Sequence, residues 1–193
     1  MRPPIIVIRH TSVAVGPQTC YGASDVALSR GWRAEFLAIE KKLQPLVVDS
    51  MRVYSSPLSR CLRLAGHLAG DSATVVVDER LREMDFGTWE LSPWADIPRE
   101  QTRAWFQDIT GHTVPGGESF AEVAARASGF LEALESEPPD TGALVVCHGG
   151  VIRALLAHVI GCRLEQSLVL NVDYGGITGL RLGPPHRLDF VNR

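Results

Sequence analysis

Two histidines, each at the end of an apolar run, are the residues whose types and spacing point most directly to chemistry. Arg9–Thr11 follows the run Ile5–Ile8, and His148–Gly150 follows Ala143–Cys147. Neutral imidazole is a nucleophile near neutral pH and can form a covalent intermediate, and an adjacent arginine offers a planar fork of donors for phosphate or carboxylate. Each segment alone also fits a structural histidine at a strand end. Together they predict a site where imidazole meets an anion.

Two further segments carry side chains suited to the same site. Arg60 lies in the first turn of a helix that Ser56 and Pro57 are expected to start, as N-cap and first helical residue. Arginine there opposes the helix dipole, which indicates either an anion site or a solvent-facing side chain. Glu83 and Asp85 follow in an irregular stretch, where one carboxyl group could act as a general acid and either could be a solvated loop residue.

Taken together and in this order, four segments resemble the histidine phosphatase (phosphoglycerate mutase-like) superfamily. They are Arg9-His10-Thr11, Ser55-Ser56-Pro57-Leu58-Ser59-Arg60, Leu81-Arg82-Glu83-Met84-Asp85-Phe86-Gly87 and Cys147-His148-Gly149-Gly150-Val151-Ile152-Arg153. The resemblance implies that His10 becomes phosphohistidine and that Arg9, Arg60 and His148 hold the phosphoryl oxygens. Glu83 would protonate the leaving oxygen and then activate water. The Gly149 backbone N–H would add a phosphate contact, and no metal or cofactor is needed.

The sequence departs from the family pattern in the loop after the first histidine. Thr11 stands where many members have glycine, and the segment Val15-Gly16-Pro17-Gln18 lacks the asparagine that touches phosphate in many members. Thr11 or Gln18 is the candidate replacement for that contact.

A finer resemblance concerns the substrate. The loop Cys20–Leu28, with Tyr21 and Gly22 as expected substrate contacts, and the segment Pro115–Ser119 look like α-ribazole-5′-phosphate phosphatases of cobalamin assembly. A broad-specificity sugar-phosphate phosphatase shares much of this pattern. A phosphoglycerate mutase is disfavoured, because the insertion before the second histidine is short. A catalytically silent protein that binds a phosphorylated ligand is the alternative outside enzymes.

The elements that must position these residues alternate between strands and helices. Strands are expected at 5–8, 52–55, 74–77 and 143–147, and all but the short strand 52–55 are expected to be buried. Helices are expected at 29–42, 57–69, 119–136 and 149–160. Two or three strands should follow within 167–191. This alternation predicts an α/β three-layer sandwich with a mostly parallel central sheet flanked by helices.

The whole chain, 1–193, is expected to form one domain with an irregular insertion at about 80–118 that roofs the site. Trp89, Trp94 and Trp105 lie in this insertion. They are equally suited to face a ring-bearing leaving group or to fill a satellite core.

Composition and net charge limit the classes of molecule that the protein is expected to bind. The net charge of -3 argues against nucleic acid or an anionic membrane as partner, and no apolar run approaches a membrane span. A small phosphorylated metabolite is the expected partner, and a homodimer is left open. The start of the chain does not fit a signal peptide, because Arg9 interrupts the apolar run. Reduced cysteines without metal-site spacing favour a cytoplasmic protein.

Overall fold

A six-stranded sheet forms the centre of the molecule. The computed structural model describes residues 3–46, 51–71, 73–137 and 142–193. The strands lie in the order β3-β2-β4-β1-β5-β6. The first four of these pair in parallel, whereas β5 and β6 are antiparallel. Their bounds are β1 Ile5–Arg9, β2 Met51–Ser55, β3 Val75–Val77, β4 Gly142–Cys147, β5 Ile177–Arg181 and β6 Arg187–Phe190.

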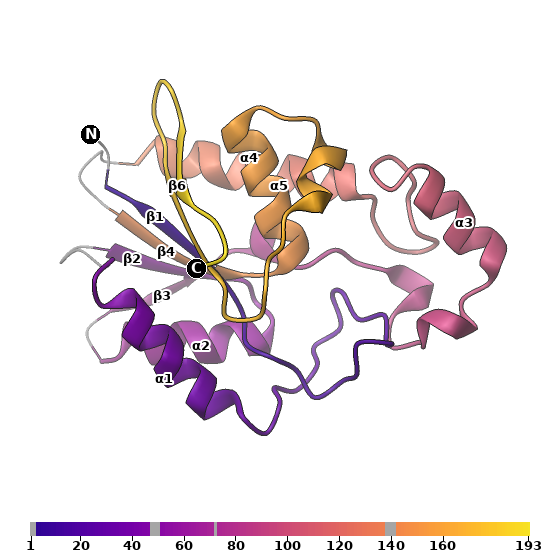
Figure 1. Cartoon of the computed structure of the whole chain (residues 1–193), viewed down its shortest axis with the longest axis horizontal. Coiled ribbons are helices and arrows are strands. Elements are labelled where there is room, and N and C mark those ends of the chain that lie inside the picture. The colour runs from indigo at the N-terminus through magenta and orange to yellow at the C-terminus, as the bar shows by residue number, and fades with distance from the viewer. Residues whose placement is uncertain (1–2, 47–50, 72, 138–141) are drawn as a thin grey trace.

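Helices cover both faces of this sheet. The helices α1 (Trp32–Leu43) and α2 (Ser59–Ala69) lie on one face, and α4 (Phe120–Glu135) and α5 (Gly149–Ile160) lie on the other (Figure 1). The short helix α3 (Arg99–Gln107) stands apart from the sheet at one end of the molecule (Figure 1). The predicted three-layer α/β architecture is therefore confirmed.

Strand β1 shows why both layers are needed. Ile6 and Ile8 pack into the core under α1 and α2, whereas Ile5 and Val7 pack into the core under α4 and α5. Successive side chains on a strand point to opposite faces, so a strand that is apolar at every position must be covered twice.

Strand β3 is not buried as predicted. It pairs only with β2 and forms one edge of the sheet, where Val76 is 43% and Val77 is 51% exposed. Its β-branched run gives the β-propensity of a strand, but this propensity does not tell an edge from a centre.

The start of α2 also differs from the prediction. The helix begins at Ser59 instead of following Ser56 and Pro57 directly. The backbone N–H and the hydroxyl of Ser59 donate to the Asp25 carboxylate at 2.9 and 2.8 Å. The Ser56 hydroxyl lies instead 2.7 Å from Nε2 of His148. A carboxylate from a distant loop thus caps the helix end, and the Ser56 hydroxyl, which also accepts the N–H of Leu58 at 3.4 Å, contacts the site.

The segment 80–118 contains 3₁₀ turns and α3. The turns are Glu79–Leu81, Gly87–Trp89 and Trp94–Asp96. Backbone hydrogen bonds tie this segment to the loop after β1, since Cys20 donates to Ser92 and receives from Leu91. Between Ser167 and Val191 the chain forms two strands, after a 3₁₀ helix at Leu164–Val169.

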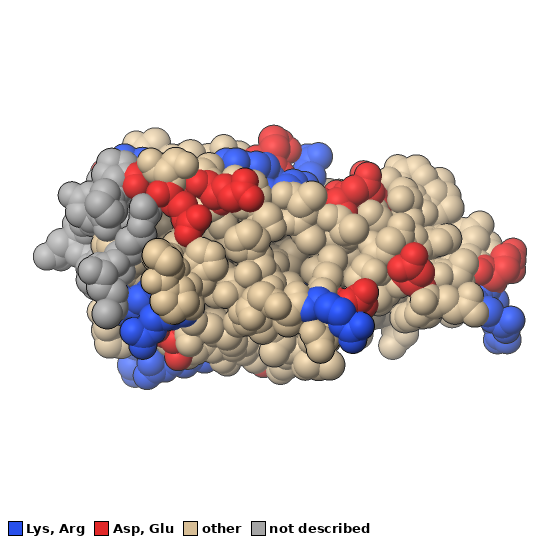
Figure 2. Space-filling view, turned by 90° about the horizontal axis from the view of Figure 1, so that it is seen from above, with Lys and Arg blue, Asp and Glu red and all other residues tan. Residues whose placement is uncertain are grey.

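On the face shown in Figure 2, the lysine and arginine side chains lie in separate small groups, so this face has no continuous basic surface. In the part of the chain that the structure describes, no helix is long and apolar enough to cross a bilayer.

Candidate active site

The sheet register brings the two histidines together. Arg9 is the partner of Cys147 across β1 and β4, and Ser55 in β2 is the partner of Val146. The next residues along these three parallel strands therefore meet at one edge of the sheet. The rings of His10 and His148 lie 5.1 Å apart between centroids. Ligands bind at the carboxyl ends of strands in such sheets.

His10 is held in one tautomer. Its Nδ1 lies 2.8 Å from the carbonyl oxygen of Thr11, which can only accept a hydrogen bond, so Nδ1 carries the proton. Burial, followed by the charge of Arg60, holds the pKa of His10 well below 6.5. The neutral ring therefore has its lone pair on Nε2, as a nucleophile requires.

His148 is fully buried, and its Nε2 lies 2.7 Å from the Ser56 hydroxyl. Burial, then the neighbouring His10 and the charge of Arg60, holds the pKa of His148 well below 6.5. His148 is therefore neutral in the free protein. Because the neighbouring arginines contribute to that lowering, a bound anion that offsets their charge would favour its protonation.

Arg60 is fully buried beside this pair and does not face solvent. Its guanidinium donates to the carbonyl oxygens of Gly22 at 2.6 Å and Ser24 at 2.7 Å. Its Nε is buried without a hydrogen-bond partner among the described residues. The guanidinium carbon lies 5.5 Å from the centre of the Tyr21 ring.

Arg9 is held in a similar way. It donates to the carbonyl oxygen of Val172 at 2.7 Å, and its guanidinium carbon lies 3.9 Å from the centre of the Tyr174 ring. Its Nε is also buried without a hydrogen-bond partner in the described part of the chain. The hydroxyls of Tyr174 and Tyr21 lie 2.5 Å apart. Two arginines, each anchored by carbonyl groups, thus keep donors available for an anion.

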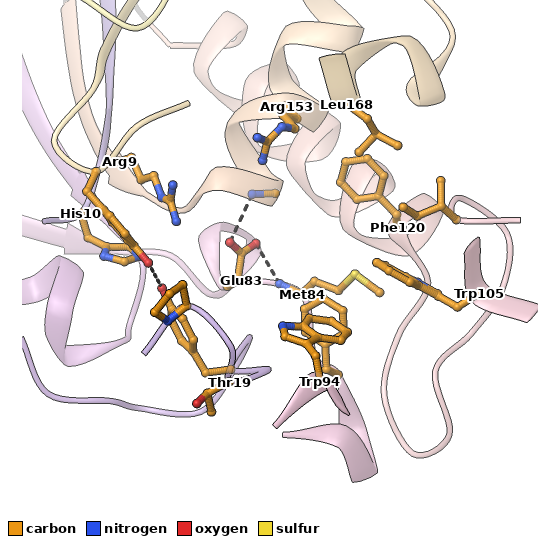
Figure 3. A pocket seen from close by; sticks show the side chains of 16 residues that line it. Arg9, His10, Thr19, Glu83, Met84, Trp94, Trp105, Phe120, Arg153 and Leu168 are labelled. Carbon is orange, nitrogen blue, oxygen red and sulfur yellow. Dashed lines mark hydrogen bonds between the residues drawn. The ribbon is translucent and has the colours of Figure 1, made fainter. Parts of the chain in front are cut away.

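The two candidate acids point in different directions. Glu83 accepts the backbone N–H of Gly150 at 3.2 Å and that of Met84 at 3.1 Å, and it lines a cavity with His10 (Figure 3). Asp85 accepts the N–H of Gly87 at 2.8 Å within its own turn and does not line that cavity. The position of Glu83 is the one suited to exchange a proton with a bound ligand.

The cavity has a volume of about 420 Å³ and two unlike ends. Figure 3 shows Arg9 and His10 at one end, Trp94, Trp105 and Phe120 at the other, and Glu83 between them. Of the other predicted contacts, Tyr21 lines the cavity, whereas the residues Gly22, Arg60, His148 and Gly149 are not among its lining residues. Gly22 instead offers its carbonyl to Arg60.

A side chain at Gly149 or Gly150 would crowd the charged groups of the site. A Cβ at Gly149 would lie 3.3 Å from Nη1 of Arg153 and 3.4 Å from Nε of Arg9, and one at Gly150 would lie 2.5 Å from Oε1 of Glu83. Glycine lets the charged groups approach the first turn of α5, whose backbone N–H groups favour anions.

Arg153 and Tyr174 are among the lining residues that sequence reasoning missed. Arg153 follows four residues after Gly149, so it returns to the same side of the helix one turn later; that spacing was the available signal. Burial, then the charge of Arg9, lowers the pKa of Arg153, which donates through Nε to the carbonyl of Leu170 at 3.1 Å. Tyr174 sits in an irregular loop and gave no pattern.

The tryptophans take both predicted roles, and Trp105 takes both at once, because it is also buried in the core beside Trp89. Trp94 and Trp105 line the cavity, stacked with ring centres 6.1 Å apart. Trp89 is a buried core residue whose Nε1 donates to Gln101 at 2.8 Å. Of the two candidates for the missing asparagine, Thr11 is buried with an unpartnered hydroxyl among the described residues, whereas Gln18 is exposed.

The chain belongs to the histidine phosphatase superfamily (branch 1), whose family model matches residues 5–188. Phosphoserine phosphatase 1 of Hydrogenobacter thermophilus is 31% identical over 176 residues, which cover 88% of this chain and 82% of that protein. A mycobacterial glucosyl-3-phosphoglycerate phosphatase, solved with VO3, is 29% identical at a TM-score of 0.84 and covers 100% of this chain and 99% of its own. The alpha-ribazole phosphatase of Shigella flexneri shares the fold at a TM-score of 0.89, 24% identity and coverages of 98% and 96%. The family and the relatives identify the chain as a phosphatase.

No group of three or more His, Cys, Asp or Glu side chains within the described residues could hold a metal ion.

Proposed function

We propose that the protein hydrolyses phosphomonoesters through a phosphohistidine at His10. Nε2 of His10 attacks phosphorus while the bond to the leaving oxygen breaks and Glu83 gives that oxygen its proton. The Glu83 carboxylate then takes a proton from water, the water oxygen attacks phosphorus, and the P–N bond breaks to restore neutral His10. Arg9, Arg60 and His148 offset the charge on the phosphoryl oxygens throughout.

One geometric observation carries this proposal: Nδ1 of His10 donates to the Thr11 carbonyl, which leaves Nε2 to act as the nucleophile, beside two arginines that keep buried N–H groups unpartnered among the described residues. A structural histidine would use both ring nitrogens, and arginines without a ligand would need carboxylate partners when buried. Positioning and charge stabilisation are what phosphoryl transfer requires of a protein.

The test is to trap the intermediate. Brief incubation with ³²P-labelled substrate at saturating concentration, followed by denaturation, should give a protein-bound phosphoryl group that is stable in base and labile in acid. We expect His10→Ala to lose both the label and turnover, by at least about 10³-fold, because no other nucleophile is present at this position. Full activity in a folded His10→Ala protein would overturn the proposal.

Hydrolysis of p-nitrophenyl phosphate in the presence of EDTA separates a catalyst from a protein that only binds phosphorylated ligands. Activity is expected, because the two arginines and His148 would supply the charge stabilisation that a metal ion supplies in kinases.

For the substrate, we propose a small phosphorylated metabolite with a ring-bearing leaving group, such as α-ribazole 5′-phosphate of cobalamin assembly. The stacked pair Trp94 and Trp105, with Phe86 and Phe120, gives the far end of the cavity an aromatic wall. Such a wall binds a flat ring better than a sugar, since it offers apolar area and few hydrogen-bond partners.

A second candidate substrate class is favoured by Arg153. This guanidinium lines the cavity beside Arg9, and no carboxylate forms an ion pair with it among the described residues. Phosphoserine and glucosyl-3-phosphoglycerate, named for the relatives, both carry a carboxylate that such a guanidinium could bind. A broad-specificity phosphatase would accept both classes.

A panel of phosphomonoesters distinguishes these classes. The ratio of kcat/KM for α-ribazole 5′-phosphate over 3-phosphoglycerate should exceed unity if the aromatic wall selects the substrate, and should fall below unity if Arg153 does.

We also propose that the protein works in a reducing compartment such as the cytoplasm. Its four cysteines are free, and the residues Cys20, Cys61 and Cys147 are buried thiols. Homodimer formation stays a prediction, to be tested by light scattering.

A further inference from the structure

We propose that Glu90 is a positioning residue that holds Arg60 in place through the peptide units of residues 22–24. Glu90 directly follows the 3₁₀ turn Gly87–Trp89 and does not line the cavity. Its carboxylate is turned to backbone N–H groups of the loop and of Phe86, so its influence passes through the backbone that it binds. The inference rests on the proposed role of Arg60 in binding the phosphoryl group.

The Glu90 carboxylate accepts four backbone N–H groups. Three come from the loop, namely those of Gly22 at 2.9 Å, Ala23 at 2.8 Å and Ser24 at 3.2 Å, and one comes from Phe86 at 2.9 Å. No lysine, arginine or histidine of the described residues forms an ion pair with Glu90. The carboxylate is thus held by amides alone, and charge-assisted bonds of this kind are stronger than neutral ones.

The opposite edge of the same loop holds Arg60. The carbonyl groups of Gly22 and Ser24, whose N–H groups face Glu90, accept the Arg60 guanidinium at 2.6 and 2.7 Å. The peptide unit between Gly22 and Ala23 lies directly between the two charges, since its N–H donates to Glu90 and its carbonyl accepts from Arg60, and both charges polarise it in the same sense. The two charges therefore support each other through the backbone without touching.

The surrounding chain is built to permit this contact. A Cβ at Gly22 would lie 1.8 Å from the carbonyl oxygen of Met84 and 2.9 Å from Oε1 of Glu90, so only glycine fits there. Leu91, next to Glu90, has a φ of 62° although it is not glycine, and its N–H donates to the carbonyl of Cys20 at 2.7 Å. Such a backbone conformation persists only where neighbouring contacts fix it, as those around Glu90 do.

The same segment also carries Glu83. Because Glu90 binds the N–H of Phe86 as well as the loop, it joins the segment of the proposed general acid to the loop that orients Arg60. Loss of the carboxylate should leave these N–H groups without acceptors and let the two carbonyl groups turn away from Arg60. The effect should appear where Arg60 works, on the phosphoryl oxygens in the transition state.

The experiment compares Glu90→Gln with wild type and with Arg60→Ala. The amide keeps the shape of the side chain but directs two donors at backbone donors. We expect kcat for p-nitrophenyl phosphate to fall about 10-fold or more with a smaller change in KM, and inhibition by vanadate, a transition-state mimic, to weaken by a similar factor. Glu122→Gln is the matched control. Glu122 accepts the N–H of Ser119 at 2.7 Å at the start of α4, outside the site, and its substitution should change neither quantity.

A double-mutant cycle shows whether Glu90 acts through Arg60. In the Arg60→Ala background, Glu90→Gln should have little further effect on kcat or on vanadate inhibition, because the group that it positions is gone. If the two effects multiply, or if Glu90→Gln alone leaves kcat and vanadate inhibition unchanged, the positioning role is overturned while the phosphohistidine proposal stands. If Arg60→Ala itself has no effect, both the role of Arg60 and that of Glu90 fall.

Circular dichroism during heating verifies that each variant is folded. Should Glu90→Gln fail to fold, Glu90→Asp keeps the charge with one methylene less. We expect Glu90→Asp to lower kcat severalfold, which is less than the loss expected for Glu90→Gln. This loss should also disappear in the Arg60→Ala background. If Glu90→Asp lowers kcat by the same factor in the Arg60→Ala protein as in the wild type, the inference is contradicted.

Discussion

The two ends of the cavity are built by different means. At the phosphate-binding end proposed here, the side chains follow the ends of β1 and β4 directly, so the register of the parallel sheet sets where they lie. At the aromatic end, Trp94, Trp105 and Phe120 come from 3₁₀ turns, from α3 and from the start of α4 (Figure 3). Their places depend on packing between loops.

This difference suits the strand-built end to catalysis and the aromatic end to the selection of substrates. A sheet of paired central strands fixes atoms closely, as the attack of an imidazole on phosphorus requires. A wall made of turns and a short helix can change its shape and side chains without disturbing the strands. Substitutions of the residues proposed to act on the phosphoryl group should therefore slow the reaction with every substrate, whereas those at the aromatic end should change which substrate is preferred.

After His10, the largest effect on rate is expected at Glu83, which lies between the two ends (Figure 3). Glu83→Gln cannot give a proton to the leaving oxygen, so kcat/KM for an alkyl phosphate should fall by about 10²–10⁴-fold. p-Nitrophenolate leaves without protonation, so its ester should lose much less. The measurement is the ratio of kcat/KM for the two esters in each variant.

Asp85→Asn is the control for Glu83→Gln, because Asp85 binds the N–H of Gly87 within its own turn. It should lower the stability of the turn without making the rate depend on the leaving group. If Asp85→Asn shows that dependence and Glu83→Gln does not, the general acid is Asp85.

A smaller effect, confined to selectivity, is expected at Trp94. Trp94→Ala removes one face of the aromatic wall, and the transfer free energy of a ring is about 1.5–3 kcal/mol, or roughly 10–150-fold in kcat/KM. The loss should appear for 2-naphthyl phosphate and be small for 3-phosphoglycerate.

Trp89→Phe serves as the control, since Trp89 packs in the core and binds Gln101. It should lower the melting temperature and leave the ratio of the two substrates unchanged. Equal losses for both substrates in Trp94→Ala would mean that the aromatic end supports the fold and does not select.

The same division explains what the sequence could predict. Arg9, His10 and His148 directly follow apolar runs of strand type, so their meeting at one sheet edge followed from the parallel order of the strands. The helix predicted at 119–136 also forms, and Ser119 and Glu122 form a capping box at its start. These features depend on residues that are close in the sequence or on the pairing register of neighbouring parallel strands.

Features that depend on distant partners were not predictable. The exposed edge position of β3 depends on which strand lies beside it, and a run of valines has the same pattern in either place. The start of α2 depends on Asp25, 34 residues away, and on the use of Ser56 by His148. Which tryptophan faces the cavity depends on how 3₁₀ turns pack, and no periodicity encodes that.

The last prediction concerns stability instead of rate, and it separates the two ends of the cavity by their dependence on pH. Burial keeps the pKa of both His10 and His148 well below 6.5 in the folded protein, whereas in the unfolded chain histidine titrates near about 6.5. Below that pH the unfolded chain binds more protons than the folded protein. The stability is therefore fully present above pH about 6.5 and decreases as the pH falls toward the folded pKa, by at most about 1.4 kcal/mol per pH unit for each histidine.

Urea unfolding between pH 7.5 and 5 measures this slope. His148→Asn should reduce it, because one of the two buried imidazoles no longer differs between the states. Trp94→Ala, at the end without titrating groups, should leave the slope as it is while lowering stability at every pH. Inorganic phosphate should flatten the slope in the wild type, since an anion beside Arg9 and Arg60 would raise the pKa of both histidines. A slope that His148→Asn leaves unchanged would show that the histidines at the strand ends are not the groups held neutral by folding.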